Sequence, residues 1–557
     1  MFKKCYLLPA IFLIICSVFF LLNKDAYLLI PPVVAIGLSF VTRNVLFSIF
    51  MGMFSGALLS VGSLSFKGVA VALLRVADHY MIEAIADTNH AGLVLFTMTI
   101  GGLVALLTQS GGLKKLLEKM LVFAQDAART QLLMMLTGML IFFDDYANTI
   151  IVGNLYRALS DKYLISREKF SFIIDATAAP VASLSVVSTW IAYELGLIAT
   201  AVEKLGIEDN AYALFIQSLP HRYYAIFLLV FIFLTIVMKR EWGVMLKAQK
   251  RAYQTGMVNR PGSNPMMAKD VAAWEENMKT NGTAMIGFFP ILVLLVVVIL
   301  GFWVQGRQAL LGNGTLGEDT TILDIFGAAD PVIVLTWGAL ISTIVAMVMT
   351  IYKKVFKFDE CFDVWIDGVK SMVLPVVILV FAWGLSAVMD ELQSGQVLGR
   401  MISQIVSVQM LPALIFLMSF LMAFATGTSW GTMAILFPLS LPLAHALLIA
   451  QGMPQDVFSA NISACIGSIL TGAIFGDHIS PISDTTIMSS IWGGIDHMDH
   501  VQSQLPYALF VGTLSVLIGY VPAGFGVSPW ITLPLGVVVM YVALKIKGEP
   551  FQVQEEV

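Results

Sequence analysis

Long apolar runs separated by short polar stretches cover most of the 557-residue chain. One helical crossing of a bilayer needs about 20 mostly apolar residues, and many of the runs approach or exceed this length. The uninterrupted runs are Leu7–Leu22, Tyr27–Val41, Phe47–Val61, Ala91–Gln109, Tyr223–Met238, Gly282–Val304, Pro331–Ile351, Val369–Met389, Leu505–Val521 and Trp530–Leu544. The pattern therefore predicts an all-α polytopic membrane protein with about 11–13 transmembrane helices.

Four further apolar stretches are interrupted by polar residues. The interruptions are FFDDYANT in Leu132–Leu159, IIDATAAP in Phe170–Val202, ATGTSWGT in Leu411–Leu448, and FGDHISPISDTT in Phe458–Ile491. Gly476 and Pro481 are expected to break the helix in the last of these. Broken backbone at membrane depth is tolerated only where protein or a water-filled cavity satisfies its polar groups. The four interruptions are therefore predicted to surround a functional site.

The first interrupted stretch is too short to cross the membrane twice. Basic residues flank Leu132–Leu159 on both sides, and this charge pattern places both flanks in the cytoplasm. Its 28 residues are fewer than two crossings of about 20 residues each require. We therefore predict a re-entrant hairpin with Asp144 and Asp145 near its tip.

Charged segments predict the domain division and the orientation. The expected units are residues 1–25 (first helix and flank), 26–238 (first membrane repeat), 239–281 (cytoplasmic linker), 282–546 (leading helix, second repeat and final helix) and 547–557 (cytoplasmic tail). The first helix is expected to be retained, because no convincing cleavage site follows it. Basic residues place the N-terminus, the linker and the C-terminus in the cytoplasm, and the acidic loop Glu318–Asp330 lies outside. Phe66–Asp87 mixes charges with apolar residues, which favours a helix lying on the membrane surface.

Four pairs of similar segments occur in the same order in the two halves. They are Pro31–Phe40 with Asp330–Leu340, Gly102–Leu113 with Gly384–Leu398, Ile173–Ser183 with Ile474–Asp484, and Ser218–Phe227 with Ser503–Phe510. The third pair matches Asp175 with Asp477. An extra crossing, Phe47–Val61, makes the matched helices of the second pair run in opposite directions. Such inverted repeats place a substrate near the middle of the membrane, where discontinuous helices meet.

Composition excludes several classes of function. Hydrophobic residues make up 58% and charged residues 12% of the chain, which is typical of a membrane protein. The net charge of −5 and the lack of a basic stripe argue against nucleic acid as a partner. The four cysteines have no metal-ligand or disulfide spacing, and no phosphate-binding G-x-x-x-x-G-K-[ST] loop is present. We therefore predict no cofactor and no ATP-driven pumping by this chain.

The interruptions supply oxygen ligands suited to Na+. The candidate ion-binding residues are Asp144, Asp145, Asn148, Asp175, Thr177, Thr428, Ser429, Thr432, Asp477, His478, Ser480, Ser483, Asp484 and Thr485. An ionised carboxylate in the membrane costs about 2.5–3.5 kcal/mol on insertion scales, so such residues usually mark an ion or proton site. The C-terminal ends of half-helices and unwound carbonyls can add ligands. We place Na+ at Asp175 and Asp477 as a hypothesis, with each carboxylate able to hold a proton instead.

Structural roles compete with these assignments. Asp144 or Asp145 can cap a half-helix, and Asn148 can satisfy free backbone groups. His478 can relay protons or act as a structural hydrogen-bond donor. A second group, in which His497 and His500 stand beside Asp496 and Asp499, resembles a metal cluster, but the sequence offers it no further ligand.

Four motifs resemble the signatures of the NhaC-type Na+/H+ antiporter family. They are GDHISPISDTT (Gly476–Thr486), FFDDYANTIIVGN (Phe142–Asn154), GTSWGTMAILFP (Gly427–Pro438) and DHMDHVQSQLPYAL (Asp496–Leu509). The resemblance extends over most of the chain from Pro31. It implies a secondary transporter of the bacterial inner membrane that exchanges Na+ for H+ by alternating access. The implied partners are Na+, H+ and the lipid bilayer, and a homodimer is left open.

Two other functions compete with Na+/H+ exchange. The family includes members similar to malate/lactate antiporters, so a Na+- or H+-coupled exchanger of a small organic anion is the first alternative. The four interruptions contain no arginine to hold such an anion, which favours the inorganic cation. An intramembrane aspartyl hydrolase with two carboxylates sharing a proton is the remote alternative. Inverted repeats with broken helices favour a transporter over an enzyme.

Overall fold

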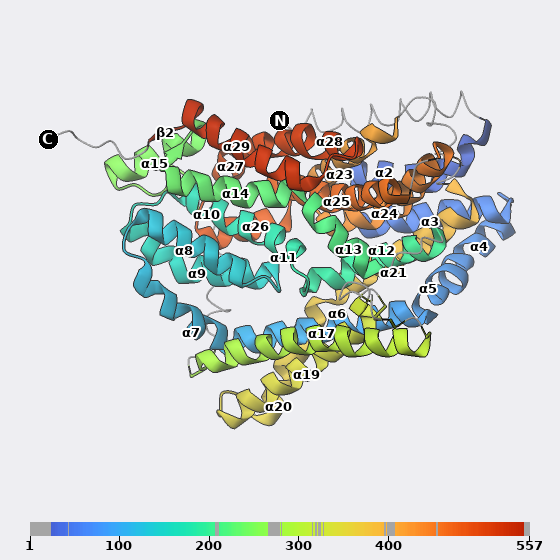
Figure 1. Cartoon of the computed structure of the whole chain (residues 1–557), viewed down its shortest axis with the longest axis horizontal. Coiled ribbons are helices and arrows are strands. Elements are labelled where there is room, and N and C mark those ends of the chain that lie inside the picture. Colours follow the sequence, from blue (N-terminus) through green and yellow to red (C-terminus); the bar gives the residue numbers. More distant parts are fainter. Residues whose placement is uncertain are drawn as a thin grey trace.

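The fold is built almost entirely from helices that pack side by side (Figure 1). The computed structural model describes residues 24–42, 44–205, 211–265, 279, 281–314, 316–317, 320, 325–326, 328–394, 397, 407–452 and 455–550. The predicted first helix Leu7–Leu22, most of the predicted external acidic loop, and residues 551–557 of the predicted tail lie outside the described residues.

The helices follow the apolar pattern closely, and several begin just after a residue whose side chain caps them, such as Asn44, Asp87 and Asp330. In the first half they are η2 (Lys24–Leu29), α2 (Ile30–Thr42), α3 (Val45–Val61), α4 (Phe66–Arg75), η3 (Val76–Met81), α5 (Ile82–Ala86), α6 (Thr88–Gln109), α7 (Gly112–Glu118), η4 (Lys119–Phe123), α8 (Ala127–Leu140), α9 (Asp145–Lys162), α10 (Arg167–Thr177), α11 (Ala179–Leu184), α12 (Thr189–Leu205), α13 (Ala211–Ser218), η5 (Leu219–His221) and α14 (Tyr223–Met238). The range predicted to lie on the membrane surface is thus helical throughout α4, η3 and α5.

The second half begins with a short strand and a polar helix and continues as a further series of helices. The elements are β1 (Arg240–Glu241), α15 (Gly243–Thr255), α17 (Ala284–Gly312), α19 (Pro331–Tyr352), α20 (Phe358–Ser371), α21 (Val373–Glu391), η6 (Val408–Met410), α23 (Leu411–Thr426), α24 (Ser429–Ala450), α25 (Gln455–Ile479), α26 (Asp484–Gly493), α27 (His497–Leu514), η7 (Ser515–Tyr520), α28 (Val521–Gly524), α29 (Pro529–Lys547) and β2 (Glu549–Pro550). Helix α20 was not predicted from the sequence.

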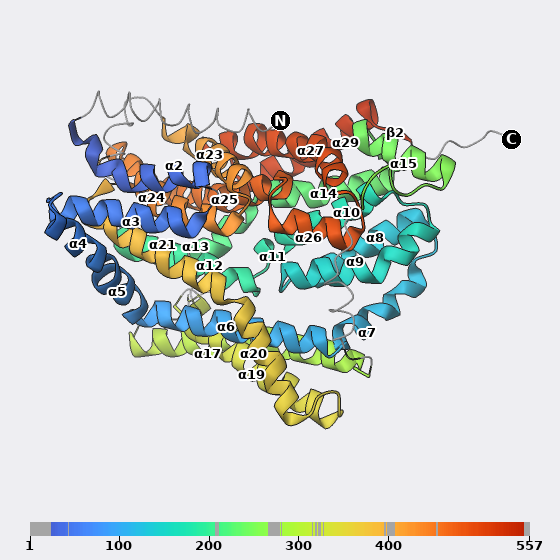
Figure 2. The ribbon, with the colours of Figure 1, turned by 180° about the vertical axis from the view of Figure 1, so that it is seen from behind.

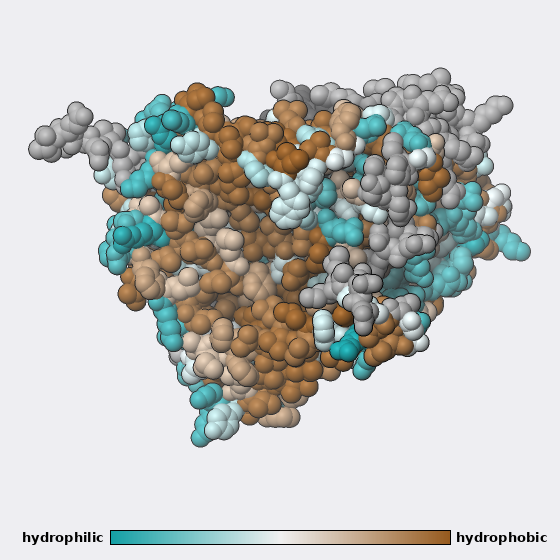
Figure 3. Space-filling view, viewed as in Figure 1, coloured by the Kyte–Doolittle hydropathy of each residue, from teal (hydrophilic) through white to brown (hydrophobic). Residues whose placement is uncertain are grey.

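The number of membrane-spanning helices agrees with the prediction. Among the described residues, nine helices are long and apolar enough to cross a membrane, and two bent pairs raise the number to as many as 11. The bent pairs are Arg167–Leu184 with Thr189–Glu203, at 48°, and Ala211–His221 with Tyr223–Met238, at 42°. Apolar side chains cover most of the face seen in Figure 3, with hydrophilic residues mainly toward its edges. The chain is a multi-pass membrane protein.

Each half contains a helical hairpin followed by a broken span. The first half has the hairpin α8–α9 and the broken span α10–α11–α12, and the second half has α23–α24 and α25–α26. The two sets pack crosswise, because α26 contacts α9 while α12 contacts α24 (Figures 1 and 2). Helices α17, α19 and α20 lie with α6 along one side of this arrangement. The crosswise packing brings the four predicted interruptions together.

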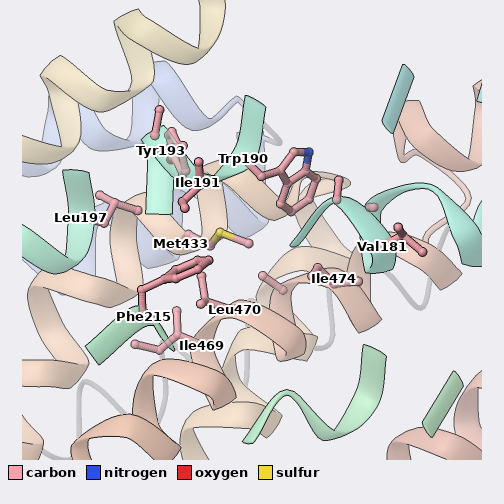
Figure 4. Packing of buried hydrophobic residues seen from close by; sticks show 14 of the residues in the cluster. Val181, Trp190, Ile191, Tyr193, Leu197, Phe215, Met433, Ile469, Leu470 and Ile474 are labelled. Atoms are coloured by element: carbon pink, nitrogen blue, oxygen red, sulfur yellow. The ribbon is translucent and has the colours of Figure 1, made fainter. Parts of the chain in front are cut away.

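The apolar core also joins the two halves. Figure 4 shows Trp190, Ile191 and Leu197 of α12 facing Met433 of α24 and Leu470 of α25. These side chains are at most 3% exposed. Burial removes apolar surface from contact with solvent, so this layer holds the broken span of the first half against the second half.

The segment predicted to link the halves packs against the ends of two helices. Gln249 of α15 accepts a hydrogen bond from the Ser166 N–H at 2.7 Å, and Arg251 binds Glu168 of α10 at 2.8 Å. Farther along, Arg260 lies 2.9 Å from Asp499 of α27. The backbone N–H of Asn264 donates to Asp496 and lowers the pKa of its carboxyl group. This segment therefore ties the ends of α10 and α27 together.

Gly476 lies inside α25, and the break begins only after Ile479. A Cβ atom at Gly476 would lie 2.3 Å from the Phe420 carbonyl oxygen and 2.6 Å from the Phe424 nitrogen. The glycine therefore allows α23 to approach α25 closely. The expectation that Gly476 breaks the helix is wrong, because close helix packing accounts for this residue.

Gly476→Ala is expected to destabilise the protein by about 1–3 kcal/mol, the usual cost of adding a methyl group to a packed core. The new methyl group would meet backbone atoms that cannot rotate away. Thermal unfolding of the purified protein measures the effect. Gly312→Ala is the matched control, because this helical glycine has open space around it. Equal unfolding temperatures for the two variants would contradict the packing argument.

Candidate functional site

The first turns of four half-helices meet at one cavity of about 490 Å³. Two come from the first half of the chain, namely α9 and α12, and two from the second half, namely α24 and α26. The cavity-lining residues of these turns are Asp144, Asp145, Tyr146, Ala147, Thr189, Trp190, Thr428, Ser429, Trp430, Asp484 and Thr485. Residues of α6, α20 and α21 complete the wall. Three of the four predicted interruptions therefore line one space. No residue of the interruption Ile173–Pro180 belongs to the described lining, and the first half contributes the start of α12 instead.

A polar side chain caps each of these helices. Asp144 Oδ1 accepts a hydrogen bond from the Ala147 N–H at 2.7 Å, and Thr428 Oγ1 accepts one from Gly431 at 3.3 Å. Ser188 accepts from Trp190 at 3.2 Å, and Ser483 caps α26 through the Thr486 N–H. Asp, Thr and Ser are preferred at this position because their oxygens satisfy free amide groups. Local sequence thus fixes where each half-helix begins.

The helix ends that face the cavity are N-terminal. The N-terminal end of a helix carries about half a positive charge and favours nearby anions. The sequence left open whether C-terminal ends would supply ligands to the site or whether Asp144 or Asp145 would cap an N-terminal end. Because the N-terminal ends of the half-helices point at the cavity, their partial positive charges stabilise carboxylates there.

Three carboxylates from two helices face this cavity. Asp144 and Asp145 begin α9 and are each 4% exposed. Thr189 donates to Asp144 Oδ2 at 3.2 Å, and the Tyr146 hydroxyl donates to Asp484 at the start of α26. None of the described residues that line the cavity is a lysine or an arginine. The site therefore gathers negative charge without a basic side chain to neutralise it.

A fourth acidic residue, Asp367 of α20, lies at the rim and was missed by the sequence analysis. It binds Lys370 at 2.8 Å, and its side chain is 58% exposed. The sequence signal was the polar helix Phe358–Ser371, which lies before the predicted span Val369–Met389. Its pairing with lysine distinguishes this residue from Asp144 and Asp145, which are buried, and from Asp484, which bonds to Tyr146.

Six of the 14 predicted site residues line the cavity, and eight do not. Those lining it are Asp144, Asp145, Thr428, Ser429, Asp484 and Thr485. Those outside its lining are Asn148, Asp175, Thr177, Thr432, Asp477, His478, Ser480 and Ser483. The predicted set therefore divides between the cavity and the structure around it.

Several residues outside the lining hold the broken backbone in place. The amide nitrogen of Asn148 donates to the carbonyl oxygens of Gly138 at 2.6 Å and Thr177 at 2.8 Å, at the end of α10. The hydroxyl groups of Thr177 and Thr432 bond to carbonyl groups of their own helices. Ser480 donates to the Phe424 carbonyl at 2.8 Å. The structural role considered for Asn148 is confirmed by these contacts.

Asp477 lies directly behind the cavity wall and is 1% exposed. Its two carboxylate oxygens accept hydrogen bonds from Ser483 at 2.8 Å and Thr485 at 3.0 Å. These bonds join the end of α25 to the start of α26, where Asp484 stands. Asp477 therefore fixes the position of a cavity carboxylate through Thr485.

Asp477→Asn is expected to reduce transport by about tenfold or more, since losing a hydrogen bond to a charged group costs about 1.5–3 kcal/mol. An asparagine side chain has one acceptor oxygen where Asp477 has two. One of the hydrogen bonds from Ser483 and Thr485 is therefore lost, and the start of α26 is held less firmly. Transport by purified protein in liposomes measures the loss, and the melting temperature reports folding. Thr513→Val, on the exposed side of α27, is a control that should transport normally. Wild-type rates from well-folded Asp477→Asn protein would remove Asp477 from the mechanism.

Asp175 has different surroundings from Asp477. It accepts hydrogen bonds from Ser489 at 3.2 Å, His500 at 3.2 Å and Gln504 at 3.1 Å. The two aspartates paired by the repeat are thus not equivalent in their contacts. Na+ binding at Asp175 and Asp477 stays a prediction, and the cavity geometry directs attention to Asp144, Asp145 and Asp484 instead.

The histidine and aspartate group at the start of α27 does not form a metal centre. Asp499 binds Arg260, and His497 bonds to Ser490 and the Pro481 carbonyl. Within the described ranges, no group of three or more His, Cys, Asp or Glu residues could hold a metal ion. Asp499 and His497 therefore act in structural contacts, whereas His500 faces Asp175.

Comparison with known proteins identifies related sequences and folds. Residues 181–525 match the model of the Na+/H+ antiporter family. The chain is 30% identical over 533 residues to an uncharacterized protein of Haemophilus influenzae, covering 94% of this chain and 96% of that protein. A shorter match, 27% identical over 106 residues, is to the malate-2H+/Na+-lactate antiporter of Bacillus subtilis, covering 15% of this chain and 23% of that protein.

Two solved transporter structures share the fold. MtrF of Neisseria gonorrhoeae, described as one of a class of antimetabolite efflux pumps, gives a TM-score of 0.54 at 13% identity, covering 84% of this chain and 93% of that chain. The YdaH transporter of Alcanivorax borkumensis gives a TM-score of 0.52 at 15% identity, covering 88% and 91%. At such low identity the likeness establishes the fold alone.

Proposed function

Because the chain belongs to the Na+/H+ antiporter family, we propose that it exchanges Na+ for H+ by binding each in turn at Asp144, Asp145 and Asp484. The chain is a secondary transporter and not an enzyme. The observation that carries the proposal is the convergence of three carboxylates in one cavity whose lining, among the described residues, includes no lysine or arginine.

Electrostatics explains why such a cavity would exchange cations and protons. Carboxylates at short separation in a medium of low dielectric repel one another strongly. A bound Na+ or a proton relieves this repulsion, and the two compete because they use the same oxygen atoms. The N-terminal ends of the four half-helices offset part of the charge, so the cavity can also release its cation.

The two-fold arrangement of the site supports alternating access. Each half contributes two half-helices to the cavity wall, and the hairpin of each half contacts the broken span of the other. Inverted repeats of this kind allow two related conformations that open to opposite sides around one site. The binding residues would then stay together while access changes.

The direct test is proton movement driven by Na+ in everted membrane vesicles or in liposomes. Adding Na+ should dissipate an imposed pH gradient, and the response to Li+ and K+ gives the ion selectivity. Vesicles from the same strain without the protein are the control. A pH gradient unaffected by any of the three cations would overturn Na+/H+ exchange.

The orientation we propose places the segment from β1 to α15 in the cytoplasm of a bacterial cell and the end of α17 outside the inner membrane. The basic residues of the segment from β1 to α15 support this orientation, because positive charge is enriched on the cytoplasmic side. In a variant without the four native cysteines, an impermeant thiol reagent should label Gly312→Cys from outside. Tyr253→Cys, on an exposed position of α15, should react only after the membrane is opened. The reverse labelling pattern would invert the orientation.

The size of the cavity supports a second candidate function, the exchange of a small organic carboxylate. A volume of about 490 Å³ exceeds the needs of one Na+ ion. The first turn of α24, with Thr428 and Ser429, carries no acidic side chain and faces the cavity with its N-terminal end. Helix N-termini bind carboxylates, and the relative named for malate and lactate suggests which solutes to test. Counterflow of labelled malate or lactate in liposomes would establish this function, and proton movement with Na+ alone would argue against it.

A further inference from the structure

A second group of ionisable side chains is buried between α10, α25 and α27, outside the lining of the cavity. Asp175 Oδ2 lies 3.2 Å from His500 Nε2 and 3.8 Å from His478 Nε2. All three residues are at most 3% exposed. We propose that Asp175, His478 and His500 form a second proton-binding site, which changes its protonation when the cavity exchanges its ion. The inference rests on the proposed function.

The hydrogen bonds of this group are incomplete. Three buried polar atoms around Asp175 have no partner among the described residues, namely His478 Nε2, His500 Nδ1 and Gln504 Oε1. Leaving one buried polar atom unpaired costs about 1–3 kcal/mol, so native proteins contain few of them. Three in one network leave it open to a proton, which an imidazole nitrogen would take up, or to an internal water, which would bridge unpaired atoms. Of these two, only a proton changes the charge of the network.

The chemistry of the three side chains suits a proton better than Na+. Imidazole is the side chain whose ordinary titration range lies nearest to neutral pH. Hard cations prefer oxygen ligands, whereas two imidazole nitrogens lie 3.2 and 3.8 Å from Asp175 Oδ2. Hydrogen bonds from Gln504 and Ser489 also use the carboxylate oxygens. The carboxylate is therefore placed to stabilise a protonated imidazole.

Neighbouring charged groups are engaged elsewhere. The ionisable groups on the surrounding elements and their partners are Lys169 and Tyr507 with Glu241, Arg167 with Asp161, Arg251 with Glu168, Asp499 with Arg260, His497 with Ser490, Tyr224 with His478 Nδ1, Asp477 with Ser483 and Thr485, and Asp484 with Tyr146 at the cavity. Asp175 therefore depends on the two histidines for its neutralising charge.

A short chain of contacts joins this site to the cavity. Gln504 donates to Asp175 and also to the His478 carbonyl oxygen. His478 is bonded through the main chain to Asp477, whose carboxylate binds Thr485 of the cavity wall at 3.0 Å. A movement of α26 on ion exchange would thus reach His478 and change its distance from Asp175. The long separation of 3.8 Å leaves room for such a change.

The test counts the protons released when Na+ binds to the full-length protein in lipid nanodiscs. Calorimetric titrations in two buffers of different ionisation enthalpy give this number directly. Relative to the wild type, His500→Gln and His478→Gln are each expected to lower it by about one proton or a fraction of one, as linkage requires for a lost titrating group. His445→Gln, a half-buried histidine of α24 beside Phe458, is the control and should leave the number unchanged.

A merely structural role for the histidines would change stability or affinity but not the proton count. Equal proton counts in the wild type and in both folded variants would overturn the inference while leaving Na+/H+ exchange intact. If the variants do not fold, infrared difference spectra of wild-type protein with ¹³C-labelled histidine decide the matter. Histidine bands that change on Na+ binding support the second site, and their absence overturns it. If the wild type shows no Na+ binding heat, the proposed function fails, and spectra across a pH titration still test whether these histidines bind protons.

Discussion

Asp145→Asn is expected to lower Na+/H+ exchange by about 100-fold, which corresponds to about 2.7 kcal/mol. The substitution keeps the size of the side chain and removes one negative charge from the cavity. Asp144, and not Asp145, accepts the capping hydrogen bond from Ala147, so α9 should still begin at the same residue. Loss of exchange would therefore reflect lost ion binding and not a displaced helix.

The matched control for this variant is Asp367→Asn. Asp367 also lines the cavity, but it lies at the exposed rim and pairs with Lys370. An exposed ion pair contributes about 0–1 kcal/mol, so exchange should change by less than about fivefold in this control. Transport in liposomes at matched protein density compares the two. Equal activity of Asp145→Asn and the wild type would place the exchanged ion elsewhere.

Apparent Na+ affinity is expected to weaken as pH falls, approaching a tenfold rise in Kd for each pH unit, or about 1.4 kcal/mol. A protonated carboxylate is neutral and has lost its attraction for Na+, whereas the anionic form at higher pH binds the cation. The full slope holds for one shared proton below the pH at which that proton dissociates. Asp144, Asp145 and Asp484 face one cavity, so their protons should dissociate as a coupled set.

Calorimetric Na+ titrations from about pH 6 to 9, a range that brackets neutral operation, test this competition. Each Na+ that binds should displace protons, and the displaced number should be larger at the acidic end. Asp145→Asn should flatten the dependence. A single affinity across the range, without proton release, would rule out competition at a shared site and would favour transport of Na+ alone.

The sequence predicted the helices well because length and apolarity decide most of them. Tyr223–Met238 was predicted with the observed bounds, and Phe47–Val61 begins two residues later than α3 does. The re-entrant hairpin was predicted from two basic flanks and from a stretch too short to cross twice. The helix α20 was missed because it is amphipathic, with apolar residues on one face and polar residues on the other. Its mean hydropathy is low, and hydropathy alone does not distinguish such a helix from a loop.

The cavity was only partly predictable, since spatial direction is not encoded in a local motif. Asp144, Asp145 and Asp484 were found because acidic residues in apolar surroundings are unusual. The sequence could not show that the half-helices face the cavity with their N-terminal ends. It also paired Asp175 with Asp477, whereas α27 supplies His500 and Gln504 to Asp175 alone. Asp175 and Asp477 occupy matching positions in the two similar sequence segments, but their tertiary contacts differ.

The absence of lysine and arginine from the described lining of the cavity has a consequence for leakage. An empty cavity holds uncompensated negative charge, and enclosing such charge away from water costs several kcal/mol per ion even after relaxation. In the exchange proposed above, the unloaded carrier would therefore meet a high barrier to reorientation, which binding of Na+ or protons would lower. A lysine among the carboxylates would lower the barrier for the empty form and let it return without cargo. The missing basic residue would thus enforce obligatory exchange, protecting the ion gradients from futile cycling.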